Sequence, residues 1–370
     1  MISEYCSLTQ TFVELLNETT FAVAAMPWED LKGDGRLSVI VKSTFRIDPE
    51  GDASIAPDQI AILTADQTYT KDPGSPTQFE SDMAPFKPRA DIVLVGKAYA
   101  PEGRPVEWMD VSLRIATLRR TMRVFGDRNW AFPSSFTLVP IMSRPKPFVR
   151  MDLTYERAFG GVYEGPGFYC KENLVGTGYI GKKRKAAIHH KRLPNLEDPK
   201  NLIRSWRSKP KPMGFGFYGR GWYPRVKYAG TYDEKYQKER APKLPRDFSY
   251  AFYNGAHPDL QVQGYLRGDE EVELVNLSRQ PRLCFRLPGI RPKITVSKWA
   301  IPPEQWIEEN ATGEREVSLN DVPTRDESIL SVLDTLVLIP DEGIFYEVFR
   351  GICRLSSLDG LEVAKVTVSM

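Results

Sequence analysis

The stretch that decides the fold is DVSLRIATLRRTMRVFG, residues 110–126. Its apolar side chains fall mainly at alternate positions, the spacing that places them on one face of a β-strand. A break in this alternation near residues 117–120 predicts a turn or bulge between two strands. We expect Val111, Leu113, Ile115, Leu118, Met122 and Val124 to face a core, with Arg114, Arg119 and Arg123 among the outward residues.

The same alternation recurs on both sides of this stretch. It is present in residues 37–47, 90–100 and 151–159, and again in residues 260–277, 281–287, 293–299, 315–319, 333–355 and 362–369. Pro340 to Gly343 has the composition of a hairpin turn, because proline presets φ and glycine accepts a positive φ. The sequence therefore predicts a mainly β fold, an antiparallel β-sandwich or barrel-like scaffold with a few short helices.

Residues 161–258 differ from the sections before and after them. Proline, glycine and aromatic residues are dense here, as in MGFGFYGRGWYPRVKYAGTYD, residues 213–233. Such prolines exclude long helices and central strands, while the aromatics argue against a solvated linker. We expect an irregular section packed by aromatic side chains, with short helices at residues 233–240 and 247–254. Antiparallel β sections at residues 1–160 and 259–370 flank it, and a core shared by the two is one arrangement that the sequence allows.

Composition limits the classes of function. Of 370 residues, 41% are hydrophobic and 11% aromatic, which is enough for a large core. The formal net charge is only +2, so a charge-driven partner must meet a local patch. We find no signal-peptide pattern and no uncharged apolar run of about 18 residues. Four widely spaced cysteines fit reduced thiols. We therefore expect a cytoplasmic protein that does not contact a membrane.

Sequence motifs for metal, cofactor or nucleophilic chemistry are absent. The three histidines lack metal-ligand spacing, no GxSxG occurs, and the GxGxxG of Gly176, Gly178 and Gly181 follows no apolar strand. We therefore expect no metal, no cofactor and no enzymatic activity. Two groups of carboxylates leave a hydrolase acting on a polysaccharide-like substrate open as an alternative. They are Glu80, Asp82 and Asp91, and Asp233, Glu234 and Asp247.

The first group of carboxylates lies in FESDMAPFKPRADIVLVGKA, residues 79–98, where charges and prolines precede a hydrophobic strand. Proline fixes φ and biases the preceding residue away from helix, so the chain approaches the strand in an extended form. The charges can then satisfy one another and the backbone groups of the loop. We predict a buried or half-buried polar latch rather than a catalytic centre, made of Glu80, Asp82, Pro85, Lys87, Pro88, Arg89 and Asp91.

An ordered series of motifs resembles a family of bacterial proteins with a domain of unknown function. The motifs include ESDMAPFKPRADIVLVGKAYAPEG (80–103), YERAFGG (155–161), ENLVGTGY (172–179), APKLPRDFSYAFYNGAHPD (241–259) and GDEEVELVNL (268–277). Genes for this family lie beside those for the spike and effectors of type VI secretion systems, and its members act as adaptors or chaperones. The resemblance implies a non-enzymatic protein that binds a cognate effector, keeps it soluble and helps load it onto the spike protein (VgrG) or its PAAR tip protein.

An adaptor needs a stable scaffold and an interaction surface, and tyrosine, tryptophan and arginine dominate binding at protein interfaces. We therefore predict partner-binding side chains in the middle section, with packing inside that section as the alternative for each. They are Trp206, Phe215, Phe217, Tyr218, Trp222, Tyr223 and Arg225. The basic run at residues 182–192, with Lys182, Lys183, Arg184 and Lys185, is predicted as an auxiliary patch. Nucleic-acid binding through this run is a weaker alternative.

Overall fold

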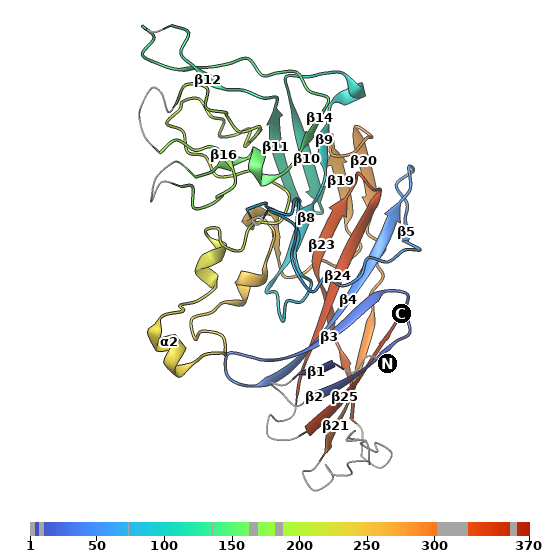
Figure 1. Cartoon of the computed structure of the whole chain (residues 1–370). Helices are drawn as coiled ribbons and strands as arrows, with labels where there is room; N and C mark the ends of the chain where they lie inside the picture. The colour runs from blue at the N-terminus through green and yellow to red at the C-terminus, as the bar shows by residue number, and fades with distance from the viewer. Residues whose placement is uncertain are drawn as a thin grey trace.

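The computed structural model describes residues 4–6, 11–72, 74–134, 136–162, 169–181, 188–301, 325–355 and 361–370. These residues form several open β-sheets with a few short helices (Figure 1). The predicted mainly β fold is confirmed in its sandwich-like form, and no sheet of the described residues closes into a barrel. The strand predicted at residues 315–319 lies outside the described residues.

A seven-stranded sheet occupies the centre of the molecule. Strands from the first and third sections of the sequence are interleaved within it, so both sections contribute to one sheet. β8 pairs in parallel with β23, whereas the other strands pair in antiparallel fashion. The strands are β18 (Gln261–Gln263), β8 (Arg89–Leu94), β23 (Ser331–Ile339), β24 (Ile344–Arg354), β4 (Gly35–Ile47) and β3 (Ala22–Glu29), with β5 (Ala53–Ile55) beside β4.

A second sheet packs on one face of the central sheet. Phe345 of β24 stacks on Phe45 of β4, with ring centroids 5.2 Å apart, and on Phe285 of the second sheet, at 5.3 Å. All three rings are buried, and the apolar area that they remove from water stabilises the sandwich. The strand order in the second sheet is β17 (Leu196–Glu197), β11 (Leu118–Phe125), β10 (Trp108–Ile115), β19 (Glu271–Val275) and β20 (Arg282–Arg286).

The stretch at residues 110–126 forms β10 and β11 of this second sheet. The turn between them lies at Ala116, whose φ is 48°. Arg114 and Arg123 lie on the outer face, where they pair with acids of the same sheet. The inward side predicted from the alternation is confirmed, because Val111, Leu113, Ile115, Met122 and Val124 are buried and Leu118 is half-buried.

A third sheet lies at the end of the molecule where the two chain termini come together (Figure 1). It approaches β24 closely at Gly351, where a Cβ atom would lie 2.9 Å from Ile294 Cδ1. Its parallel β2–β25 pair, like β8–β23, departs from the antiparallel scaffold expected, and β1, β2 and β3 have no counterpart among the predicted strands. The order is β1 (Glu4–Cys6), β2 (Thr11–Asn17), β25 (Leu361–Ser369), β21 (Lys293–Ile301) and β22 (Arg325–Ile329).

The middle section is irregular, as the sequence predicts. α2 (Glu234–Glu239) confirms the helix expected at residues 233–240, and the 3-10 helix η4 (Tyr250–Tyr253) lies within residues 247–254. A small hydrophobic cluster around Trp130, Phe159 and Ile203 packs part of this section. Two other 3-10 helices here are η3 (Arg225–Tyr228) and η5 (Pro258–Leu260).

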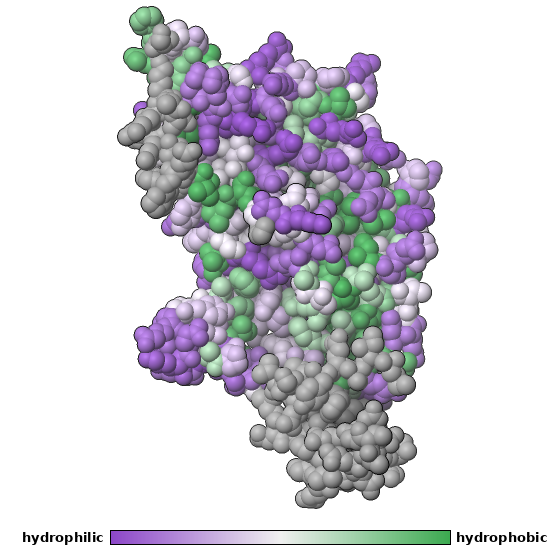
Figure 2. Space-filling model, in the orientation of Figure 1, coloured by the Kyte–Doolittle hydropathy of each residue, from purple (hydrophilic) through white to green (hydrophobic). Residues whose placement is uncertain are grey.

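The remaining strands described form short two-stranded sheets. They pair β6 (Gln67–Thr68) with β7 (Thr77–Phe79), β9 (Lys97–Tyr99) with β14 (Arg150–Asp152), β12 (Trp130–Ala131) with β13 (Ile141–Met142), and β15 (Phe159–Gly160) with β16 (Thr177–Gly178). On the face seen in Figure 2, hydrophilic residues alternate with smaller apolar groups. Among the described residues, no helix has the length and apolar character needed to cross a membrane.

The aromatic stack between the two sheets predicts a large loss of stability for Phe345→Ala. Removing a fully buried ring leaves a cavity against Phe45 and Phe285, so the free energy of unfolding should fall by about 3–5 kcal/mol. Phe136→Ala is the matched control, because Phe136 is 90% exposed, and it should change that free energy by less than about 0.5 kcal/mol. Urea unfolding followed by circular dichroism measures both. Similar values for the two variants would contradict this packing of Phe345.

Candidate functional site

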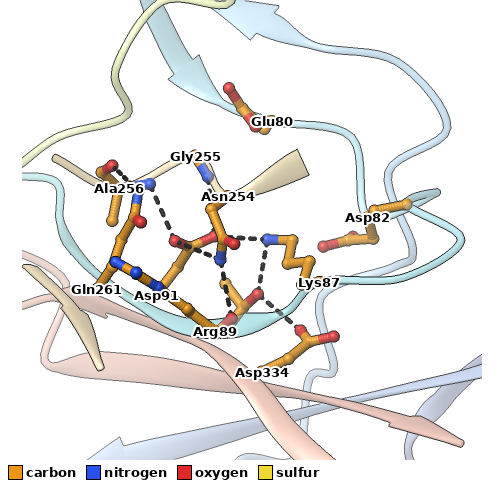
Figure 3. Close-up of polar contacts among 12 residues, drawn as sticks. Glu80, Asp82, Lys87, Arg89, Asp91, Asn254, Gly255, Ala256, Gln261 and Asp334 are labelled. Atoms are coloured by element: carbon orange, nitrogen blue, oxygen red, sulfur yellow. Dashed lines mark hydrogen bonds and ion pairs between the residues drawn. The ribbon is translucent and has the colours of Figure 1, made fainter. Parts of the chain in front are cut away.

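The polar latch is a buried network between the central sheet and the middle section (Figure 3). At its centre Asp91, on β8, is fully buried, and its carboxylate accepts four hydrogen bonds. The donors are Lys87 Nζ at 2.9 Å, Asn254 Nδ2 at 3.1 Å, and the backbone amides of Gly255 at 2.8 Å and Ala256 at 3.2 Å. Because an unpaired buried carboxylate is costly, the charge of Asp91 depends on these donors.

Lys87 extends the network to the neighbouring strands. Its Nζ atom also donates to Thr335 Oγ1 at 2.8 Å, and Thr335 donates to Asp334 Oδ1 at 2.8 Å. Asp334 in turn lies 2.6 Å from Arg350 Nε, and the same guanidinium donates to the carbonyl of Ala84. The buried charges thus connect β8, β23 and β24 with the segment that precedes β8.

The other two acids of the latch pair with distant parts of the chain. Asp82 Oδ2 lies 2.9 Å from Lys42 Nζ on β4, and burial lowers the pKa of that lysine although the carboxylate opposes the shift. Glu80 binds both terminal nitrogens of Arg225 at the start of η3, and Arg225 Nε donates to the carbonyl of Phe252 at 2.8 Å. The latch therefore consists of separate ion pairs rather than one local cluster.

The remaining latch residues differ in their placement. Pro85 is buried, and its carbonyl accepts a hydrogen bond from Ser38 Oγ at 2.6 Å, while Pro88 is half-buried. The Arg89 side chain is exposed, and its backbone carbonyl accepts from Asn254 Nδ2 at 2.8 Å. Arg89 lies outside the buried network that we predicted it would join, because it begins β8 opposite an edge strand, where water solvates its charge.

The second group of carboxylates stabilises the local fold of the middle section. Asp233 caps α2 by accepting from a backbone amide of its first turn at 2.8 Å, and Glu234 forms an exposed ion pair with Lys238 at 2.7 Å. Asp247 accepts from the hydroxyl and the amide of Thr231 at 2.7 and 3.0 Å, and these bonds lower its pKa. A general acid needs a raised pKa, so this geometry does not favour the hydrolase alternative.

Most of the aromatic side chains predicted to bind a partner are buried. Tyr218 and Trp222 pack edge to face on Tyr155, with ring centroids 5.5 and 5.2 Å from it. The loop also reaches the central sheet, because the amide of Leu94 donates to the carbonyl of Phe215 at 2.9 Å. Direct contact with a partner is therefore wrong for the buried residues, which are Phe215, Phe217, Tyr218, Trp222 and Arg225.

Three other predictions for partner binding have different outcomes. Tyr223 is 46% exposed, so it remains available to a partner. Trp206 is half-buried and packs against the small hydrophobic cluster of the middle section. Lys182, Lys183, Arg184 and Lys185 lie outside the described residues.

Tyr223 belongs to a set of exposed apolar and aromatic side chains that we call the middle-section surface. The amide of Tyr223 donates to the carbonyl of Lys171 at 2.8 Å, which joins the chain before η3 to the segment that holds Tyr169. Sequence reasoning missed the aliphatic members, because an aliphatic residue in an irregular loop gives no signal of exposure. The members are Val162, Tyr169, Leu174, Tyr223 and Val226.

A cavity of about 430 Å³ lies beside β9 and β14, outside the latch. Lys97 Nζ lies 3.8 Å from Asp152 in its wall. Burial, together with the charges of Asp152 and Glu156, raises the pKa of Tyr69 to about 12, so this phenol stays a neutral donor. Sequence reasoning missed the cavity because its carboxylates come from two distant parts of the chain. They are Asp152, Glu156, Asp341 and Glu342, and because they outnumber the lining cations Lys97 and Arg157, they favour a cationic group.

Glu347 is a buried carboxyl of a different kind. It is fully buried on β24, and within the described residues neither of its carboxyl oxygens has a hydrogen-bond partner. Burial and then the nearby charge of Glu270 raise its pKa well above the usual value, so the folded protein keeps this proton to a higher pH than the unfolded chain does. It does not line the cavity beside β9, and we assign its effect to stability rather than to chemistry.

The fold and these sites together define a mainly β protein with ordered, irregular loops held by buried ion pairs. The chain belongs to a family of uncharacterized proteins conserved in bacteria, DUF2169, whose model matches residues 32–350. Neither the curated proteins nor the solved structures give a significant match. In the described parts of the chain, no group of three or more histidine, cysteine, aspartate or glutamate side chains could hold a metal ion.

The Asp91 network predicts that Asp91→Asn is strongly destabilising. The substitution leaves Lys87 buried without its counter-charge, so the free energy of unfolding should fall by about 3–5 kcal/mol. Arg89→Gln, two residues away on the same strand, is the control and should have an effect below about 0.5 kcal/mol because Arg89 is exposed. Guanidinium unfolding measures both. If Asp91→Asn kept full stability while partner binding was lost, a binding role would replace the structural one.

Glu347 predicts a dependence of stability on pH. Its folded-state pKa lies above the usual value of 4.5, so as pH rises the unfolded chain loses this proton before the folded chain does. The contribution of Glu347 to the free energy of unfolding is therefore fully present below about pH 4.5, and it is lost as pH rises through the folded-state pKa. Glu347→Gln cannot ionise, so its stability relative to the natural protein should increase between pH 5 and pH 8.

Urea unfolding at several pH values tests this prediction. Glu271→Gln is the control, because Glu271 is exposed on β19 and its substitution should give a difference that stays small across the range. A stability difference for Glu347→Gln that is constant from pH 5 to pH 8 would show that Glu347 does not titrate as described.

Proposed function

We propose that this protein is a non-enzymatic adaptor, or chaperone, that acts in the cytoplasm. It binds a type VI secretion effector, keeps it soluble and helps load it onto the spike protein (VgrG) or its PAAR tip protein. The observation that carries this proposal is the middle-section surface, where apolar and aromatic side chains are exposed on loops that buried ion pairs hold in place. The resemblance of the sequence motifs to adaptors of this kind supports the same role.

The exposed residues of this surface stand directly beside buried anchors. Trp222 is buried next to exposed Tyr223, and Arg225, paired with Glu80, is buried next to exposed Val226. Since the neighbouring side chains are fixed, the surface loses little conformational freedom when a partner binds. A rigid apolar surface of this kind can cover apolar segments of an effector that would otherwise aggregate.

The acidic cavity supports a second type of contact with the same partner. Its carboxylates come from the chain around β14 and from the turn after β23, and they would receive a lysine or arginine side chain of the effector. A charged contact of this kind adds specificity to an apolar interface, because a partner with an acid at that position would be repelled.

The hydrolase alternative is not favoured, because each carboxylate group that suggested it serves another purpose. Asp82 and Asp91 hold buried lysines, and Asp233 caps a helix. For nucleic-acid binding, the formal net charge of +2 provides no general attraction.

Co-expression with the effector encoded beside it tests the adaptor proposal. We expect the two proteins to co-purify, and the effector to become insoluble when this protein is omitted. Tyr223→Ala combined with Val226→Ser should weaken the complex by about tenfold, because both side chains belong to the exposed surface. Trp108→Ala is the control, since Trp108 is 49% exposed on β10 and is not a member of the middle-section surface, and it should leave affinity unchanged.

Calorimetric titration of the purified proteins gives the affinities. Failure of the two natural proteins to form a complex, with effector solubility and secretion unaffected by removal of this protein, would exclude the adaptor role. Equal affinity of the Tyr223/Val226 variant and the natural protein for the effector would show that the interface lies elsewhere on the molecule.

A further inference from the structure

The hairpin that joins β12 and β13 carries an unusual concentration of exposed apolar side chains. Phe136 and Leu138 are 90% and 91% exposed. Solvent-exposed apolar groups this close together mark interaction sites more often than chance exposure does. Figure 2 shows an apolar group at a tip that projects from the molecule near β12 of Figure 1. The exposed members are Phe136, Leu138, Val139, Ile141 and Met142, and we call them the hairpin tip.

The base of this hairpin is firmly attached to the protein. Trp130 is buried in the small hydrophobic cluster and pairs with Met142, while Ala131 pairs with Ile141. Below this pair, the amide of Ser143 donates to the carbonyl of Asn129 at 2.9 Å, and Ser143 Oγ accepts from the amide of Asn129 at 3.0 Å. The exposure of the tip is therefore a property of an ordered element and not of a loose strand end.

The outer part of the hairpin has its own internal order. The amide of Thr137 donates to the carbonyl of Ser134 at 3.1 Å, and Thr137 Oγ1 accepts from the amide of Ser134 at 3.2 Å. Pro133 and Pro140 restrict the backbone on either side, and Pro140 is buried. A segment that is already shaped in this way pays little entropy on binding, so its apolar side chains can contribute fully to affinity.

Charge decides which kind of surface fits the tip. Residues 131–143 contain no charged residue, and the first cation after them, Arg144, lies 2.5 Å from Glu107. Attraction to anionic lipid needs cations among the apolar residues, and residues 131–143 themselves supply none. An uncharged apolar groove on a protein is the complementary surface. Leu138 and Val139 are exposed before the buried Pro140 and Ile141 is exposed after it, so several apolar side chains are available to a groove.

We propose that the hairpin tip inserts into an uncharged apolar groove of the effector, as a contact separate from the middle-section surface. This inference rests on the proposed adaptor function, because it names a second site for the same partner. Binding would cover apolar residues on both proteins and would fix the orientation of the effector by two points of contact.

The test uses the full chain with Leu138→Ser and Val139→Ser together, titrated with the purified effector encoded beside it. We expect affinity to fall by about tenfold or more, with an unchanged unfolding midpoint because both side chains are exposed. Leu330→Ser is the matched control, since Leu330 is 77% exposed outside the hairpin, and it should bind as the natural protein does.

The outcomes separate this inference from the adaptor function. If the natural protein binds the effector and the Leu138/Val139 variant binds equally well, the hairpin inference is wrong and the adaptor function stands. If the natural protein does not bind, both fail. Sedimentation with phosphatidylglycerol vesicles that requires Leu138 and Val139 would assign the tip to lipid and overturn the inference. A dimer of the natural protein that the variant dissociates, measured by light scattering, would assign it to a second copy and also overturn it.

Discussion

The buried carboxylate of Asp91 is the constraint on which the rest of the structure depends. It lies on a central strand without access to water, and three of its four donors come from residues 254–256 of the middle section. Separating the middle section from the sheet would leave this charge with Lys87 as its remaining donor, which is costly in a low-dielectric interior. Hydrogen bonds to this buried carboxylate therefore help attach the irregular loops to the sandwich. The loops themselves contain little regular secondary structure.

The same constraint explains how an irregular section can present a defined surface. The ion pair of Glu80 with Arg225 joins the segment before β8 to the middle section and fixes the residues beside Arg225. Exposed side chains such as Tyr223 and Val226 then stand on a backbone that does not have to be ordered by the partner. Rigidity that other proteins obtain from helices is supplied here by buried polar groups and by edge-to-face contacts such as that of Tyr155 with Trp222.

Alternation in the sequence predicts which residues of a strand face the core. It does not predict which strands pair or where the loops lie in the tertiary structure. The inward residues of β10 and β11 are correct because a strand with one buried face repeats every two residues. β3 was missed because its exposure hardly alternates along its length, and the parallel pairing of β8 with β23 is a property of topology that local pattern does not record. The latch residues other than Arg89 are buried or half-buried as predicted, yet Asp82 and Glu80 take partners from distant segments. Phe215 and Phe217 were predicted to contact a partner because composition does not show which aromatic residues of a loop are buried.

The pairing of β4 with β24 has a consequence for how this chain is made. Ser43 and Glu347 lie opposite each other in these strands although 304 residues separate them, and both strands are almost fully buried in the finished sheet. During synthesis, β4 leaves the ribosome long before its partner strand β24. One edge of this apolar strand therefore stays unpaired for most of translation. A protein proposed to protect another from aggregation would thus itself pass through an aggregation-prone stage during its synthesis.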